Sequence, residues 1–101
     1  MTIEIVSFRN YKKNTLQGFL TIRLTNVGLE IRDATLHERG GERWVGLPSK
    51  PYEAEGETKY SYIVKFYEKA KYHQFQKAAL EALDEYMQTN REDAQETDVP
   101  F

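Results

Sequence analysis

Basic and aromatic residues lie side by side at several places between residues 9 and 60, and together these residue types can hold single-stranded nucleic acid. Rings stack on bases for about 1–3 kcal/mol each, while Lys and Arg contact the phosphates. Tyr11 and Tyr52 fall in predicted polar loops and are the better stacking candidates. Trp44, the only Trp, also fits a core position, and Tyr60 fits an ordinary sheet position. The candidate nucleic-acid-binding residues are Arg9, Tyr11, Lys12, Lys13, Arg23, Arg43, Trp44, Lys50, Tyr52, Lys59 and Tyr60.

The distribution of charge favours the same chemistry. The whole chain has a formal net charge of -2. Residues 1–80 contain 13 Lys and Arg against 9 Asp and Glu, a balance of +4, whereas residues 81–101 contain 1 Arg against 7 Asp and Glu, a balance of -6. A basic body with an acidic end is typical of a nucleic-acid surface beside an interaction tail.

The C-terminus has the composition of a recognition peptide. An acidic run over residues 92–98 ends in Val99, Pro100 and Phe101. The Phe101 ring can enter an apolar pocket while its carboxylate meets a partner's Arg or Lys, and Pro100 lowers the ordering cost. This end resembles the tip of bacterial single-stranded DNA-binding proteins, which recruits repair, replication and recombination proteins. The resemblance implies that Asp98, Val99, Pro100 and Phe101 bind such partners. The alternative is that Phe101 folds back onto the core.

A small β-rich domain must position these residues. Apolar alternation predicts strands over residues 2–8, 16–25, 29–37, 43–47 and 59–66. The apolar positions of the third strand change from one face to the other near Asp33, which predicts a bulge. Gly40 and Gly41 predict a tight hairpin turn. Polar residues 10–14 predict a turn, and residues 48–58, with two prolines, predict a loop. Apolar residues at helical spacing predict one helix from about Lys69 to Asn90: Tyr72, Phe75, Ala79, Ala82, Leu83 and Tyr86.

The predicted fold is therefore α+β, an about five-stranded and mostly antiparallel meander with one C-terminal helix. One helix covers one sheet face and leaves the other for solvent, a second subunit or a ligand. The polar residues 91–101 show no periodicity and predict a disordered acidic tail. The chain divides into a nucleic-acid-binding domain over residues 1–90 and this tail.

Several other functional classes are not expected. No apolar run approaches the roughly 20 residues that span a bilayer, and the N-terminus lacks the pattern of a signal peptide, so a cytoplasmic location is expected. Without cysteine there is no disulfide and no Cys-ligated zinc. His37 and His73 lie far apart, and no phosphate-binding Gly-rich loop or activated nucleophile is present. We therefore expect no metal, no cofactor and no catalysis.

Three segments within residues 16–87 are similar to the sequence pattern of a known protein family. They are Trp44-Val45-Gly46-Leu47-Pro48-Ser49-Lys50, the preceding Ile31-Arg32-Asp33, and Phe75-Gln76-Lys77-Ala78-Ala79-Leu80 with Tyr86. They resemble the stage V sporulation protein G family. The resemblance implies a small protein that dimerises through its sheet and binds nucleic acid, with Lys50 near the bound strand. The chain departs from the family between Tyr60 and Tyr72, where the His-Pro step is missing, and in its acidic tail.

These observations predict a single-stranded DNA-binding protein of a phage or mobile element. It would coat its strand with little sequence preference and assemble as a homodimer or higher oligomer. It would recruit DNA repair, replication and recombination proteins through its tip, without contact with membranes. Two alternatives stay open: a site-specific DNA- or RNA-binding regulator like the sporulation family, and a protein-interaction module that mimics the tip.

Overall fold

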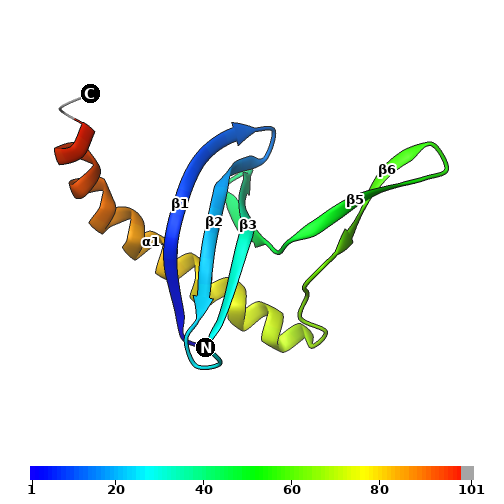
Figure 1. The fold of residues 1–101 in the computed structure, drawn as a ribbon, viewed down its shortest axis with the longest axis horizontal. Helices are drawn as coiled ribbons and strands as arrows, with labels where there is room; N and C mark the ends of the chain where they lie inside the picture. The colour runs from blue at the N-terminus through cyan, green and yellow to red at the C-terminus, as the bar shows by residue number, and fades with distance from the viewer. Residues whose placement is uncertain (99–101) are drawn as a thin grey trace.

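The computed structural model describes residues 1–98, with the side chains of residues 1–89. Strands β1–β4 form an antiparallel sheet in the order β1-β2-β3-β4, and β5 and β6 pair with each other as a separate hairpin. The predicted α+β class with one C-terminal helix is confirmed (Figure 1). The elements are β1 (Ile3–Lys13), β2 (Leu16–Leu24), β3 (Leu29–Arg39), β4 (Glu42–Gly46), β5 (Ser49–Ala54), β6 (Glu57–Tyr62) and α1 (Lys69–Asp98).

Helix α1 crosses one face of the four-stranded sheet (Figure 1). Phe75, Ala79 and Leu83 recur every four residues, so they lie on one side of the helix, and each is fully buried. The apolar residues predicted at helical spacing therefore include those that the helix contributes to the core. No other element of the described chain covers the opposite sheet face (Figure 1). The core residues from the sheet side are Ile5, Leu20, Ile22, Leu24, Ile31, Ala34, Leu36, Val45 and Leu47.

The predicted bulge and hairpin turn are both confirmed. Between the pairs Leu20–Ala34 and Ile22–Ile31, strand β3 has one residue more than β2, and Asp33 has a φ of 59°. Gly40 and Gly41, between β3 and β4, have φ angles of 60° and 85°. Glycine adopts these left-handed angles without steric cost, which is why the turn forms at these two residues.

The predicted loop over residues 48–58 is wrong, and the predicted strand over residues 59–66 forms only in its first part, within β6 (Glu57–Tyr62) and outside the four-stranded sheet. Strand β5 pairs with β6 around a turn in which Glu55 and Gly56 have positive φ angles. Ile63 N–H bonds to the carbonyl of Pro48 at 2.9 Å, and hydrogen-bonded pairs alternate from there. Pro51 consequently falls at a position whose nitrogen faces outward, where its missing N–H costs nothing. This hairpin, residues 49–62, is termed the arm and extends away from the sheet and helix (Figure 1).

Helix α1 continues past its predicted end at Asn90 to Asp98, through the first eight residues of the segment predicted to be disordered. Residues 91–98 contain no Gly or Pro, and most of them are good helix formers. The predicted partner-binding residues Val99, Pro100 and Phe101 lie outside the described residues.

Candidate nucleic-acid interface

Two rings and a cation meet on the uncovered sheet face near the β1–β2 turn. Phe19 of β2 pairs with Arg9 of β1. Its side chain points to the other face of the sheet from that of its neighbour Leu20, which is buried under the helix. The Tyr11 and Phe19 ring centroids are 5.8 Å apart, and the Arg9 guanidinium lies 5.2 Å from the Phe19 centroid. Phe19 is half-buried, whereas Tyr11 is 52% exposed. This cluster offers ring surface for a base with a guanidinium beside it for a phosphate.

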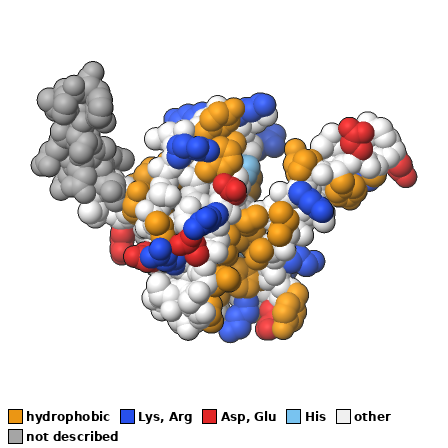
Figure 2. Space-filling model, viewed as in Figure 1, with side chains coloured by type: hydrophobic (Ala, Val, Ile, Leu, Met, Phe, Trp, Pro, Cys, Tyr) orange, Lys and Arg blue, Asp and Glu red, His pale blue; other side chains and the backbone are white. Residues whose placement is uncertain are grey.

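The end of the β1–β2 hairpin adds positive charge to this cluster. The predicted turn over residues 10–14 is wrong, because β1 continues to Lys13 and the chain turns at Asn14, whose φ is 56°. Lys12 and Lys13 are both exposed. Figure 2 shows Lys and Arg side chains gathered at this end of the sheet, next to hydrophobic side chains. A shallow hollow of about 210 Å³ lies beside the cluster, lined by Ser7, Arg9, Phe19, Leu20, Thr21 and Asp33.

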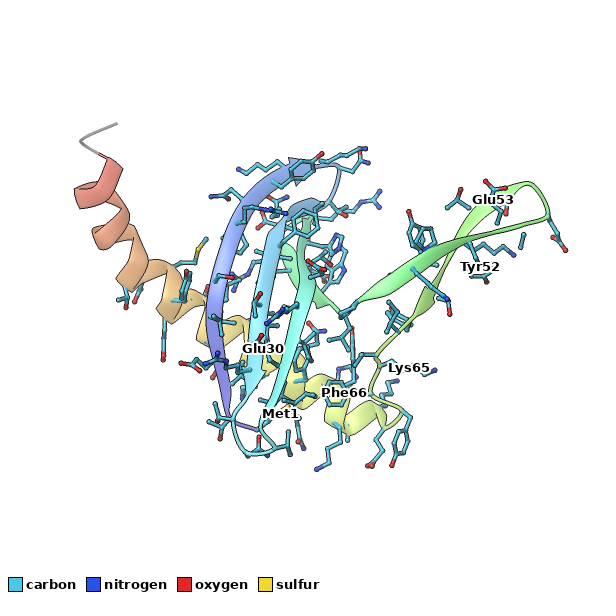
Figure 3. The ribbon with its side chains drawn as sticks, in the orientation of Figure 1. Met1, Glu30, Tyr52, Glu53, Lys65 and Phe66 are labelled. Atoms are coloured by element: carbon cyan, nitrogen blue, oxygen red, sulfur yellow. The ribbon has the colours of Figure 1, made fainter. Side chains whose placement is uncertain are left out.

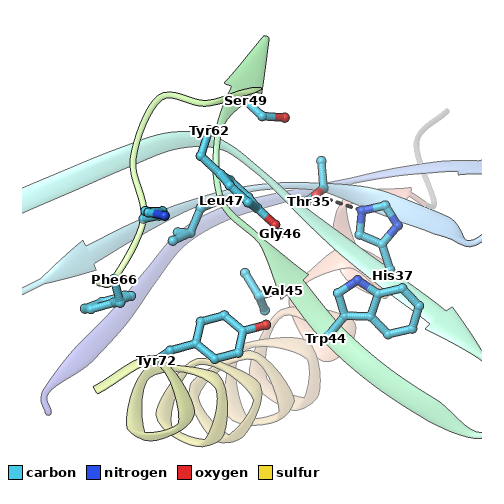
Figure 4. A pocket seen from close by; sticks show the side chains of 11 residues that line it. Thr35, His37, Trp44, Val45, Gly46, Leu47, Ser49, Tyr62, Phe66 and Tyr72 are labelled. Carbon is cyan, nitrogen blue, oxygen red and sulfur yellow. Dashed lines mark hydrogen bonds between the residues drawn. The ribbon is translucent and has the colours of Figure 1, made fainter. Parts of the chain in front are cut away.

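A second pair of rings lies farther across the same face, on β3 and β4. Trp44 is opposite His37, and the two rings are stacked with centroids 5.4 Å apart and planes 8° apart. Both imidazole nitrogens are hydrogen bonded. Nδ1 bonds to the Thr15 hydroxyl at 3.0 Å. Nε2 bonds to the Thr35 hydroxyl at 2.9 Å, the contact drawn in Figure 4. Burial lowers the pKa of His37. The imidazole is therefore neutral near pH 7, and its ring lies parallel to the indole of the half-buried Trp44.

Two predicted arginines lie away from these rings. Arg43 points to the helix side of β4, where both of its terminal nitrogens donate to the Asp84 carboxylate, at 2.9 and 3.1 Å. This contact lowers the pKa of Asp84. Arg23 lies at the other end of the sheet, 2.8 Å from a Glu30 oxygen and 3.7 Å from a Glu4 oxygen. Carboxylates offset both charges, so neither arginine forms part of the aromatic surface.

The predicted residues of the arm are divided between its two faces. Tyr52 lies opposite Lys59, and Lys50 shares their face, since alternate residues of a strand point to the same side. Tyr60, opposite Pro51, lies on the other face together with Tyr62. Tyr52 is 46% exposed, Tyr60 69% and Tyr62 64%. Figure 3 shows Tyr52 and Glu53 far out on the arm.

The sequence interpretation missed several residues of this surface. Phe19 had a detectable signal, because it is an aromatic residue out of phase with the apolar Leu20, Ile22 and Leu24. Tyr62 was placed in a strand but not among the candidates. Lys65 was also missed, although Phe66 and Tyr67 follow it directly; it lies in the connection between β6 and α1 (Figure 3).

Comparison with known proteins identified no family. No protein-family model, curated protein or solved structure matches the chain. The likeness to the sporulation family stays a prediction.

Two features are absent from the described residues. No helix in them is long and apolar enough to cross a membrane. They also contain no group of three or more acidic or histidine side chains placed to hold a metal ion.

Proposed function

We propose that the protein binds single-stranded DNA across the uncovered face of its four-stranded sheet, with little sequence preference. The observation that supports this most strongly is the cluster of Arg9, Tyr11 and Phe19 on a face that no helix covers. A ring can stack on any base, and a cation can meet any phosphate, so such contacts hold a strand without reading its sequence.

The register of the strands gives the bound DNA a direction across the sheet. Arg9, Phe19, Thr35 and Gly46 lie directly opposite one another in successive strands, from β1 to β4. The row begins at the basic hairpin and ends with two small residues, Thr35 and Gly46, beside the base of the arm. A strand that enters at Lys12 and Lys13 can cross the rings and reach Trp44 and the arm lysines, Lys50 and Lys59.

The same surface favours unpaired over paired bases. Stacking on Phe19 or Trp44 requires a base whose flat side is free, and in a duplex each base is already covered by its neighbours. The competing hypothesis is a regulator that binds duplex DNA, because a two-stranded ribbon such as the arm has the size to enter a major groove.

We further propose that the C-terminal tip recruits DNA-metabolism proteins. Figure 1 shows the last turns of α1 passing beyond β1 and away from the arm. The helix therefore carries the acidic segment clear of the proposed DNA path. A homodimer or higher assembly belongs to this proposal, since one such domain spans only a few nucleotides.

Fluorescence anisotropy of labelled dT oligomers tests the DNA proposal. Affinity should rise with oligomer length and fall with salt by a slope of about -0.7 per phosphate contacted. An unlabelled duplex of equal length should compete poorly, and a uridine oligomer tests discrimination against RNA. Absence of binding at low salt would refute the proposal, and stronger competition by the duplex would favour the regulator.

Deleting residues 99–101 tests the recruitment proposal. The truncated chain should bind dT oligomers at least as tightly as the full chain. It should no longer bind a purified repair protein that recognises the tip of bacterial single-stranded DNA-binding proteins, as measured by calorimetry. Equal binding of that protein by both chains would exclude a role for the tip.

A further inference from the structure

A pocket of about 300 Å³ lies where β4, the base of the arm and the start of α1 meet. Trp44 of β4, Tyr62 of β6 and Tyr72 of α1 line it, so its rings come from three separate elements (Figure 4). We propose that this pocket takes one unpaired base of the bound strand and that Lys65 contacts an adjacent phosphate. The inference rests on the proposed binding of single-stranded DNA.

The size and the walls of the pocket suit one base. Its volume is at the lower limit of about 300–1,000 Å³ for small-molecule pockets, which leaves room for little more than one ring system. In Figure 4 the rings of Tyr62 and Tyr72 reach in from opposite sides, with their hydroxyls toward His37 and Trp44. The stacked His37 keeps the indole of Trp44 in a fixed plane. Indole and phenol rings are the side chains that stack on bases.

Polar groups at the mouth can meet the edge of a base. Among the described side chains, the hydroxyls of Ser49, Tyr62 and Tyr72 have no hydrogen-bond partner, although all three residues line the pocket. A hydroxyl can donate or accept, so it can adapt to the edge of any base. These groups fit a pocket that holds a base without demanding one sequence.

Gly46 keeps the pocket connected to the uncovered face. A Cβ atom at this position would collide with the Thr35 hydroxyl and come within 3.5 Å of His37 Nε2. The bare backbone therefore preserves the hydrogen bond between Thr35 and His37. Because Gly46 ends the row that starts at Arg9, a strand crossing the sheet arrives at the pocket.

Lys65 supplies the charge. Its side chain lines the pocket and is exposed, and it forms no ion pair within the described part of the chain. Arg23 and Arg43, in contrast, are held by carboxylates. A free ammonium group at the mouth of an aromatic pocket is placed to meet the phosphate of a nucleotide whose base is inside.

The single Trp allows one titration to test the inference. Trp44 emission reports the pocket, while the anisotropy of a labelled dT oligomer reports total DNA binding. We expect emission to be quenched in parallel with the rise in anisotropy. Tyr62→Ala should weaken binding about 5- to 150-fold and reduce the quench, from about 1–3 kcal/mol per stacked base. Lys65→Ala should lower the magnitude of the salt slope by about 0.7.

Matched controls lie next to the pocket and do not line it. Tyr67→Ala removes a ring that is 88% exposed, and Lys69→Ala removes an exposed charge at the start of α1. Both should bind as the parent does. If Tyr62→Ala and Lys65→Ala behave as their controls, the pocket takes no base and the sheet-face proposal stands. If DNA binds but Trp44 emission stays constant, the pocket takes no base and the sheet-face proposal stands only for the cluster of Arg9, Tyr11 and Phe19. If no DNA binds in the anisotropy assay, both proposals are overturned.

Discussion

Replacing Phe19 with Ala removes the ring at the centre of the proposed DNA surface. Tyr11 loses a neighbour 5.8 Å away, and Arg9 loses a ring 5.2 Å from its guanidinium. The core keeps all its members, because Phe19 faces away from the helix, in the opposite phase to Leu20. The substitution should therefore weaken DNA binding and leave the chain folded.

The sizes of the two effects can be compared. Loss of one stacked base costs about 1–3 kcal/mol of binding, which weakens affinity about 5- to 150-fold. In the free protein the ring pair contributes about 0.5–1.5 kcal/mol and the cation–π contact about 0.5–1 kcal/mol. The free energy of unfolding should fall by about 1–2.5 kcal/mol, which leaves a domain of ordinary stability, about 5–15 kcal/mol, folded.

The assay is the anisotropy titration at one fixed salt concentration, with circular dichroism to verify that the variant is folded. Phe19→Tyr keeps a ring in place and should retain most of the affinity. Tyr67→Ala removes an exposed ring outside the surface and should bind as the parent does. A folded Phe19→Ala chain that binds within twofold of the parent would show that DNA does not lie on this face.

Three further predictions concern the framework. The Gln76 side chain donates to Val45 O and accepts from Val45 N–H, both at 2.8 Å, on the outer edge of β4. Gln76→Leu should therefore lower the free energy of unfolding in urea by about 2–3 kcal/mol, and a smaller loss than 1 kcal/mol would contradict this role. Because burial lowers the pKa of His37, the unfolded chain takes up a proton at higher pH than the folded chain. Stability should be complete above a pH of about 6.5 and decline as the pH falls toward the folded pKa, and His37→Asn should reduce this decline in urea titrations from pH 5 to 7.5. Arg43→Ala breaks the two hydrogen bonds to the partly exposed Asp84 and should cost about 1 kcal/mol of stability. Its DNA affinity should change less than twofold, and a larger loss would show that Arg43 contacts the DNA.

The sequence predicted the four-stranded sheet because one face of each strand is buried. Leu20, Ile22 and Leu24 alternate strictly, and all three are core residues. The bulge at Asp33 was visible for the same reason, since an extra residue shifts the phase of the buried positions. Gly40 and Gly41 marked their turn through their backbone freedom.

Only the second strand of the arm was predicted, from the alternation of Tyr60 and Tyr62 with polar residues; β5 and the pairing of the two strands were not, because neither face of the arm is buried. Every residue from 49 to 62 is exposed except Ala54, and β5 carries no apolar alternation that would have indicated a strand. The same reasoning applies to the end of β1, where every residue from 10 to 13 is exposed although the strand still pairs with β2. The pocket was also hidden, because Trp44, Tyr62 and Tyr72 come from elements that no spacing along the chain connects.

The four-stranded sheet and α1, together termed the body, share one core to which the arm contributes no residue. The pocket lies where the body and the arm meet. An isolated two-stranded hairpin is marginally stable in water, and the arm has no core of its own. The Ile63–Pro48 hydrogen bond and the ring of Tyr62 lie at its base, where the pocket is found. A base held between Tyr62 of the arm and Trp44 and Tyr72 of the body would join the two parts through the ligand. DNA binding would then stabilise the orientation of the arm, and the arm's exposed rings and lysines would extend the path that begins at Arg9 and Phe19.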